Sequence, residues 1–243
     1  MGRGRLRRWD YETMSDLLAV AQGVKNADLY FHGADLINVY SGTVHKANLA
    51  VYGERIAYVG LSDKMVGPAT QVIEVTGKFL APGYIEPHGH PFLLYNPVTH
   101  AKHVLTNGTT SSINDNLILM RNLPLDELIN LMELFGELPI KMLWSARLDP
   151  QTFADDESYA EKFSYANIRR LIEHRYVMQI GELTDWPSLL AGNVNLRRLM
   201  VDTLIAGKKA EGHTPGASAN TLNSLAVAGV TACHESITIE EVL

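Results

Sequence analysis

Four short segments of this chain contain side chains of the types that bind metals, and each segment lies at the end of a short apolar run. They are His88-Gly89-His90, Ile180-Gly181-Glu182, Gly212-His213-Thr214 and Cys233-His234-Glu235. In a barrel of parallel strands, the C-terminal ends of the strands converge on one face. The pattern therefore predicts a curled parallel sheet on which five ligand groups meet at one site.

The segments between these fragments support the same architecture. From Lys78 onward we expect strands at 79–86, 109–114, 140–146, 176–181, 209–212 and 229–233, and helices near 125–136, 156–174, 188–205, 218–228 and after Thr238. Strand–helix alternation is typical of parallel βα units. Six units are fewer than the eight of a closed (β/α)8 barrel. The predicted class is α/β, a TIM-like barrel that is incomplete, as part of a longer protein or as an open sheet.

The first third of the chain has a different pattern. Short runs rich in Val, Ile, Leu and Tyr occur at 28–33, 35–40, 48–52, 55–59 and 71–75, with turn residues between them. Such a series predicts a small β-sheet module. We expect three parts: an N-terminal helical segment at 1–26, a small β-sheet domain at 27–80 and a truncated βα barrel at 81–243.

Composition narrows the class of protein. The 243 residues are 46% hydrophobic and have a formal net charge of -6, which argues against a nucleic-acid-binding surface. No apolar stretch approaches the roughly 18 residues of a membrane span. The single cysteine, Cys233, excludes an intramolecular disulfide and favours the cytoplasm.

The two histidines of the first fragment have the spacing of a ligand pair. Residues i and i+2 of a strand point to the same face, so His88 and His90 aim at one point. Neutral imidazole is a common ligand of zinc and iron. Taken alone, the pair could equally be two loop histidines.

The other candidate metal ligands support a metal site only when they are considered as a set. Glu182, His213 and His234 each follow a predicted strand, where singly they could be loop or buried residues. Asp149, Asp185 and Glu235 are further residues that could line the site. Glu235 is the best of these candidates because it adjoins His234. We read Cys233 as a core residue on the opposite face of its strand. The remaining histidines lie away from the strand ends and are read as surface or helix residues: His32, His45, His100, His103 and His174.

From about residue 15 the chain resembles the amidohydrolase superfamily and, within it, adenine deaminases. The segment Ala81–His90 is similar to the first barrel strand of that superfamily, and 38–42 with 54–60 to its small β-domain. Two further blocks, Gly181–Gly192 and Gly212–Glu235, are similar to adenine deaminases in particular.

The resemblance implies a metal-dependent hydrolase that converts adenine to hypoxanthine and ammonia. It implies metal ligation by His88, His90, His213 and His234, with Glu182 as a bridging carboxylate. The cofactor would be a divalent metal, two ions of Mn, Fe or Zn. Glu182 and Glu235 are the candidate catalytic residues. The expected partners are a small purine or related heterocycle and, for a full-length protein, further copies of itself, with neither nucleic acid nor membrane.

Three features depart from the adenine deaminase pattern. The family's last ligand, an aspartate on the final strand, has no counterpart before the chain stops at Leu243. Asp115-Asn116-Leu117-Ile118 stands where an Asp-Pro-His-Glu run is usual, and an apolar segment at 91–97 follows the histidine pair. We expect these last two changes to alter the pocket and leave the metal ligands intact.

Two other functions remain open at this stage. A cyclic amidase of the same superfamily, hydantoinase-like or dihydroorotase-like, would usually have lysine where Glu182 stands. The chain could also be an inert fragment, because an open sheet has two unpaired edges that favour aggregation. On that reading, residues 1–243 alone would be poorly soluble and inactive.

Overall fold

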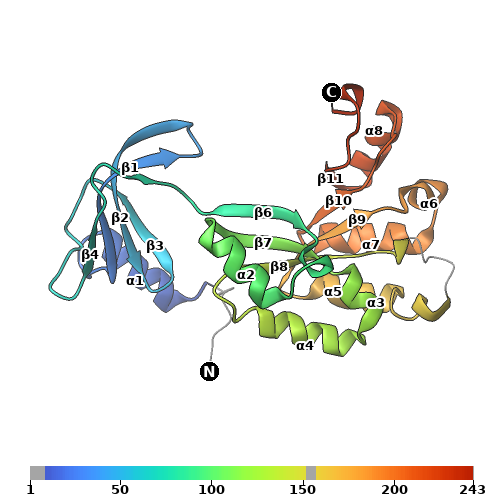
Figure 1. The fold of residues 1–243 in the computed structure, drawn as a ribbon, viewed down its shortest axis with the longest axis horizontal. Coiled ribbons are helices and arrows are strands. Elements are labelled where there is room, and N and C mark those ends of the chain that lie inside the picture. Colours follow the sequence, from blue (N-terminus) through green and yellow to red (C-terminus); the bar gives the residue numbers. More distant parts are fainter. Residues whose placement is uncertain (1–8, 152–156, 243) are drawn as a thin grey trace. The chain divides into compact units, whose positions relative to one another are not determined.

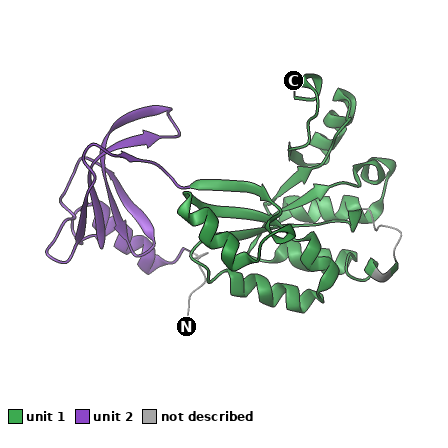
Figure 2. Cartoon of the chain, viewed as in Figure 1, with its two compact units in different colours: residues 1–6, 84–243 green, residues 7–83 purple. Residues whose placement is uncertain are grey.

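The computed structural model describes residues 9–151 and 157–242, which fall into two compact units divided at Gly83 and Tyr84 (Figure 2). The smaller unit comprises helix α1 (Tyr11–Ala21) and a sheet. Asp10 caps α1 by accepting a hydrogen bond from the Thr13 amide at 2.7 Å. The sheet has the strand order β3-β2-β1-β4, with β5 also paired to β1. Its strands are β1 (Leu29–Asn38), β2 (Thr43–Tyr52), β3 (Arg55–Gly60), β4 (Gln71–Glu74) and β5 (Phe79–Leu80).

One strand of this sheet differs from the prediction. The runs at 28–33 and 35–40 are not two strands but the single strand β1, whose pairing with β2 shifts between Phe31 and Ala34. Gly33 lies in that irregularity with φ +81°, a conformation that glycine adopts without strain. A Cβ at Gly33 would also lie 2.2 Å from Thr76 Oγ1. The apparent turn in the sequence is therefore a bulge within one strand.

The larger unit is built on six parallel strands in the order β11-β10-β9-β8-β7-β6 (Figure 1). Each strand pairs with its neighbour in the sequence, so the prediction of six βα units is confirmed. The strands are β6 (Tyr84–Gly89), β7 (Thr109–Asp115), β8 (Lys141–Ala146), β9 (Val177–Leu183), β10 (Lys209–Gly212) and β11 (Val230–Cys233).

Helices connect these strands. They are α2 (Pro97–Thr106), α3 (Leu117–Asn122), α4 (Leu125–Phe135), α5 (Tyr165–Glu173), α6 (Trp186–Ala191), α7 (Val194–Ile205), α8 (Ala219–Val227) and α9 (Ile239–Val242), with short 3-10 turns at Pro91–Leu93 and Glu157–Tyr159. Ser164, Asn193 and Ser218 cap three of the helices through their side-chain oxygens. None of the helices among the described residues is both long and apolar enough to cross a bilayer.

Several elements differ from the prediction. The helix expected at 156–174 is a 3-10 turn at Glu157–Tyr159 followed by the separate helix α5. The strand expected at 79–86 is two strands, because β5 pairs with β1 of the small sheet and β6 with β7. The helix expected at 188–205 is interrupted at Gly192, whose φ of +105° ends α6. Helices α2 and α3 were not predicted, since both follow segments that read as polar or proline-rich loops.

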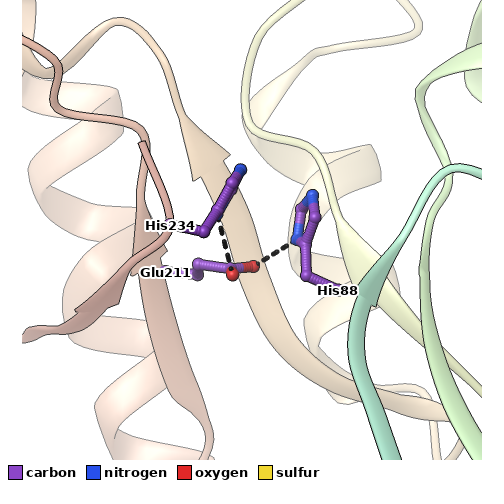
Figure 3. A group of neighbouring side chains, drawn as sticks. All are labelled: His88, Glu211 and His234. Atoms are coloured by element: carbon purple, nitrogen blue, oxygen red, sulfur yellow. Dashed lines mark hydrogen bonds and ion pairs between the residues drawn. The ribbon is translucent and has the colours of Figure 1, made fainter. Parts of the chain in front are cut away.

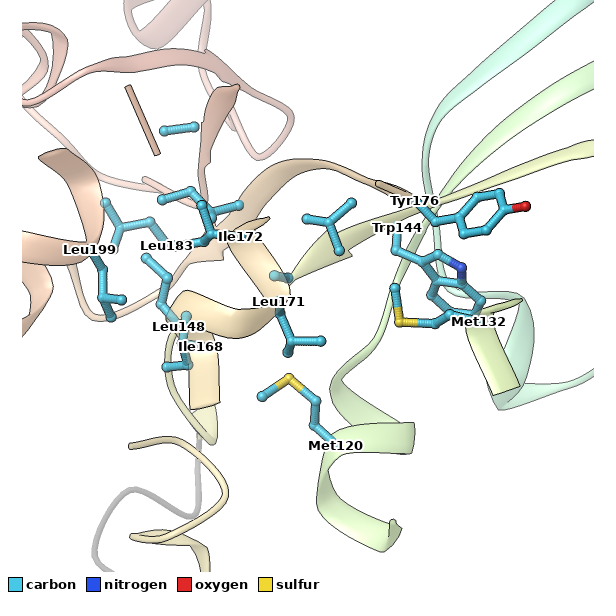
Figure 4. Close-up of a cluster of buried hydrophobic side chains, with 14 of the residues drawn as sticks. Met120, Met132, Trp144, Leu148, Ile168, Leu171, Ile172, Tyr176, Leu183 and Leu199 are labelled. Atoms are coloured by element: carbon cyan, nitrogen blue, oxygen red, sulfur yellow. The ribbon is translucent and has the colours of Figure 1, made fainter. Parts of the chain in front are cut away.

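The core of the larger unit lies between the sheet and its helices (Figure 4). Trp144 of β8, Met132 of α4 and Leu171 of α5 are fully buried within it. Helix α5 packs against β8 and β9, and α7 against β10. These contacts fix the strands whose C-terminal ends carry the polar residues described below.

We expect the apolar face of α4 to dominate its contribution to stability. Leu128 is 1% exposed in the core, whereas Leu134 on the same helix is 64% exposed. Leu128→Ala should lower the free energy of unfolding by roughly 2–5 kcal/mol, because it removes buried methyl groups and leaves a cavity. Leu134→Ala should change it by less than about 0.5 kcal/mol. Urea denaturation followed by circular dichroism measures both, and equal effects would contradict this packing.

Candidate metal centre and adjoining pocket

The ends of four strands deliver the five predicted ligands. His88 lies in β6 and His90 follows it, Glu182 lies in β9, and His213 and His234 directly follow β10 and β11. Although β6 and β11 are the two outermost strands of the sheet, the His88 and His234 rings are stacked with centroids 4.1 Å apart. The sheet is therefore curled, and its outer strands meet at their C-terminal ends.

The first group of possible metal ligands consists of His88, His90 and Glu182, with both histidines close to one oxygen of Glu182. Both His88 Nε2 and His90 Nε2 lie 2.8 Å from Glu182 Oε1, and the two nitrogens are 2.9 Å apart. Glu182 is 4% exposed. Two imidazole nitrogens and a carboxylate oxygen at these distances can share a single divalent cation with a small adjustment of the side chains.

A second group of possible metal ligands consists of His213, His234 and the same carboxylate of Glu182. His234 Nε2 is 3.4 Å from Glu182 Oε1, and His213 Nδ1 is 3.6 Å from Glu182 Oε2. The three ligand atoms lie within 4.8 Å of one another. His213 Nδ1 is buried and has no hydrogen-bond partner among the described residues. A buried imidazole nitrogen without a partner beside a carboxylate fits a metal ligand, so the donor set suits a divalent cation at this position too.

Sequence reasoning missed Glu211, which lies behind the histidines. Its Oε2 accepts from His88 Nδ1 at 2.7 Å, and its Oε1 is 3.1 Å from His234 Nδ1 (Figure 3). Gln179 Nε2 donates a third hydrogen bond at 2.7 Å. A signal was present, because Glu211 precedes His213 by two residues and so faces the same side of β10.

Two more charged residues lie at strand ends: Asp115, which belongs to a segment that we expected to alter the pocket, and Arg147, which the sequence analysis missed. Asp115 ends β7, and Arg147 follows β8 and is fully buried. Arg147 Nη1 donates to Asp115 Oδ2 at 3.2 Å and to Glu182 Oε2. The rule that identified the ligands, a polar residue at a strand end, applies equally to these two positions.

These contacts shift the ionisation of the buried groups. Burial disfavours protonated His88, but its hydrogen bonds to Glu182 and Glu211 prevail and raise its pKa to about 10. Burial alone would raise the pKa of Glu182, but bonds from His88 and His90 and the charge of Arg147 hold it below its usual range. Burial raises the pKa of Asp115. The site holds three buried acidic side chains, Asp115, Glu182 and Glu211, against one buried arginine, Arg147. A divalent cation that displaces the proton of His88 would offset the excess of acidic groups.

A cavity of about 360 Å³ opens beside the two donor groups. Its polar lining includes His90, Asp115, Arg121, Glu182, His213 and Glu235, and its apolar lining Phe92, Leu93, Leu117 and Ile118. The two segments that depart from the adenine deaminase pattern therefore line the pocket, as predicted. Glu235 is partly exposed, with Oε1 3.5 Å from His234 Nε2 and 3.9 Å from His213 Nδ1.

Three residues do not have the positions that the sequence predicted. Cys233 is exposed rather than a core residue, because β11 is the last strand in the described sheet and no further strand covers it. Asp149 does not line the cavity but accepts hydrogen bonds from Thr184 Oγ1 and the Gln151 amide. Asp185 precedes α6 and does not line the cavity either.

The fold is similar to those of two hydrolases of known structure. A D-aminoacylase described as defining a subset of amidohydrolases superposes with a TM-score of 0.51 over 88% of this chain and 52% of its own, at 16% identity. An N-acyl-D-glutamate deacylase from Bordetella bronchiseptica, solved with zinc and a phosphonate inhibitor, gives 0.57 over 86% of this chain and 52% of its own, at 15% identity. No family model matches the chain.

The sequence comparison identifies a narrower group of similar proteins than the comparison of structures. The chain is 38% identical over 226 residues to a protein of Picrophilus torridus named as a putative adenine deaminase, and 30% identical over 234 residues to an adenine deaminase of Moorella thermoacetica. These alignments cover 93% and 96% of this chain but 39% of each relative. The chain is thus similar over most of its length to proteins named as adenine deaminases or putative adenine deaminases, and it spans about two-fifths of their length.

Arg147 should be essential to the stability of the site without metal. Arg147→Met removes the buried cation beside Asp115 and the partner of Glu182 Oε2, and should cost about 3–5 kcal/mol in the free energy of unfolding. Adding Asp115→Asn should recover part of that loss. The measurement is urea denaturation in the presence of a chelator.

The matched control is Arg169→Met, which removes an exposed ion pair with Glu173 on α5. That change should cost less than about 1 kcal/mol. If Arg147→Met cost no more than the control, the proposed charge compensation would be wrong.

Proposed function

We propose that this chain carries the metal centre and part of the substrate pocket of a hydrolytic deaminase that converts adenine to hypoxanthine and ammonia. The observation that supports this most strongly is the convergence of four histidine nitrogens on the single carboxylate of Glu182. The adenine deaminase relatives supply the reaction and the substrate.

The proposed ligands are His88, His90 and Glu182 for one cation and His213, His234 and Glu182 for a second. Imidazole and carboxylate donors suit Mn, Fe and Zn. When bound, the metal supplies Lewis acidity for the attack of water on the ring carbon that bears the amino group. Glu182, held by Arg147 at Oε2, keeps the two ligand groups at a fixed separation.

The residues of the pocket have separate proposed roles. Phe92, Leu117 and Ile118 present apolar surface to a flat heterocycle and limit access of bulk water. Glu235, at the edge of the cavity beside His213 and His234, is placed to carry a proton to the departing nitrogen. We further propose a cytoplasmic role in purine salvage and a homo-oligomeric state for the full-length protein.

Ammonia release tests the reaction. We expect the longest natural form of the protein, stripped of metal and reloaded with Mn, Fe or Zn, to release ammonia from adenine. A panel of pyrimidines and cyclic amides distinguishes a deaminase from a cyclic amidase, which would open a ring without releasing ammonia. Metal-loaded full-length protein that acts on no member of the panel would refute the proposed activity.

Removal of a ligand tests the site itself. His90→Asn should weaken cation binding by more than the roughly 10–100-fold typical of losing a residue that only supports a ligand. His45→Asn is the control, because His45 is exposed on β2 in the other compact unit. Isothermal titration with Mn²⁺ measures both, and equal affinities would show that His90 is not a ligand.

A further inference from the structure

The site contains a buried carboxylate that the proposed reaction does not use. The side chain of Glu211 is 9% exposed and lies on β10. Three N–H groups surround its two oxygens, from His88 Nδ1, His234 Nδ1 and Gln179 Nε2. A carboxylate so fully engaged has a fixed orientation and few free lone pairs.

The three partners of Glu211 come from three different strands, of which β9 and β11 adjoin β10 while β6 lies at the far end of the strand order. His88 belongs to β6 and His234 follows β11, the two ends of the strand order, while Gln179 belongs to the neighbouring strand β9. Figure 3 shows the carboxylate between the two imidazoles, with one oxygen toward each. Glu211 thus links the two outermost strands at the point where the sheet curls together.

The hydrogen bonds also select a tautomer for each histidine. A carboxylate accepts, so Nδ1 of each ring must carry the proton, which leaves Nε2 with a free lone pair when the ring is neutral. Those Nε2 atoms lie 2.8 Å and 3.4 Å from Glu182 Oε1. Glu211 therefore orients one histidine from each of the two groups of possible ligands, so that the Nε2 atom of each ring is available to a metal.

We propose that Glu211 is a positioning residue for both cations, holding His88 and His234 in the tautomer and orientation that metal binding requires. This inference rests on the proposed metal site but not on the identity of the substrate. Carboxylates that accept from the second nitrogen of a ligand histidine commonly have this role, and their loss weakens metal binding about 10–100-fold.

Direct ligation by Glu211 is the competing explanation. His88, Glu211 and His234 could themselves surround an ion. That ion would need the Nδ1 atoms as ligands and would displace both hydrogen bonds. The two roles differ in the number of ions bound, because a lost ligand removes a site and a lost positioning residue weakens existing ones.

The test is Zn²⁺ binding by Glu211→Gln, measured by competition with a chromophoric chelator and by metal analysis. An amide can accept from one Nδ1–H but presents an NH₂ group to the other, so only one histidine keeps its partner. We expect about 10–100-fold weaker binding with unchanged stoichiometry. Glu173→Gln, an exposed change on α5, should leave both unchanged.

A shorter acid separates geometry from charge. Glu211→Asp keeps the negative charge but is one methylene too short to reach both rings, so we expect weakened binding here as well. Wild-type affinity in this variant would show that charge alone matters and would overturn the positioning role. This variant also serves if Glu211→Gln fails to fold.

Nitrogen NMR of the zinc-loaded protein supplies a readout that general destabilisation does not produce. We expect protonated Nδ1 signals for His88 and His234 in the wild type and the loss of at least one in Glu211→Gln. Loss of one ion per chain, or an unchanged affinity, would overturn the proposal. A wild type that binds no Zn²⁺ would overturn this inference and the proposed metal site together, whereas zinc binding without deamination would refute only the proposed reaction.

Discussion

The buried carboxylate of Glu182 is the feature on which the arrangement of the site depends. An isolated ionised carboxylate is costly to bury, and the cost is offset only by nearby positive charge and well-made hydrogen bonds. At Oε2 that charge comes from Arg147, and at Oε1 from protonated His88, or from a cation that the histidines would bind. Because these groups come from strands β6, β8 and β9, the curl of the sheet and the ionisation of Glu182 stabilise each other.

The same requirement explains why charged residues occupy the ends of neighbouring strands. Asp115 and Arg147 form a buried pair beside Glu182, and Glu211 occupies the opposite side behind His88 and His234. Each buried acid has a donor, yet the acids outnumber the one arginine. The proposed divalent cation would offset the remaining charge and would engage His213 Nδ1, which has no hydrogen-bond partner among the described residues.

The sequence predicts what depends on local pattern. Alternating apolar and helical segments were sufficient to locate the six strands of the larger sheet, and ligand-type residues at their ends identified the five that the structure brings together. The role of Glu211 could not be predicted in this way, because it depends on the proximity of β6 and β11, which no local pattern specifies. The burial of Arg147 likewise follows from partners 32 and 35 residues away. Helix α2 was missed for a different reason, since Pro97 reads as a turn residue but stands at the start of the helix, where proline is well tolerated.

The pocket beside the candidate metal centre sets limits on how a substrate could be recognised. Apolar walls such as Phe92 and Leu117 accept flat rings but discriminate weakly, because a small group is worth only about 1–3 kcal/mol there. Strong discrimination requires polar groups with free hydrogen-bonding capacity. Asp115 has little, since one oxygen accepts from the Leu117 amide and the other from Arg147. Glu235 is more exposed and keeps this capacity, so in this pocket it is a better candidate than Asp115 for selecting a substrate.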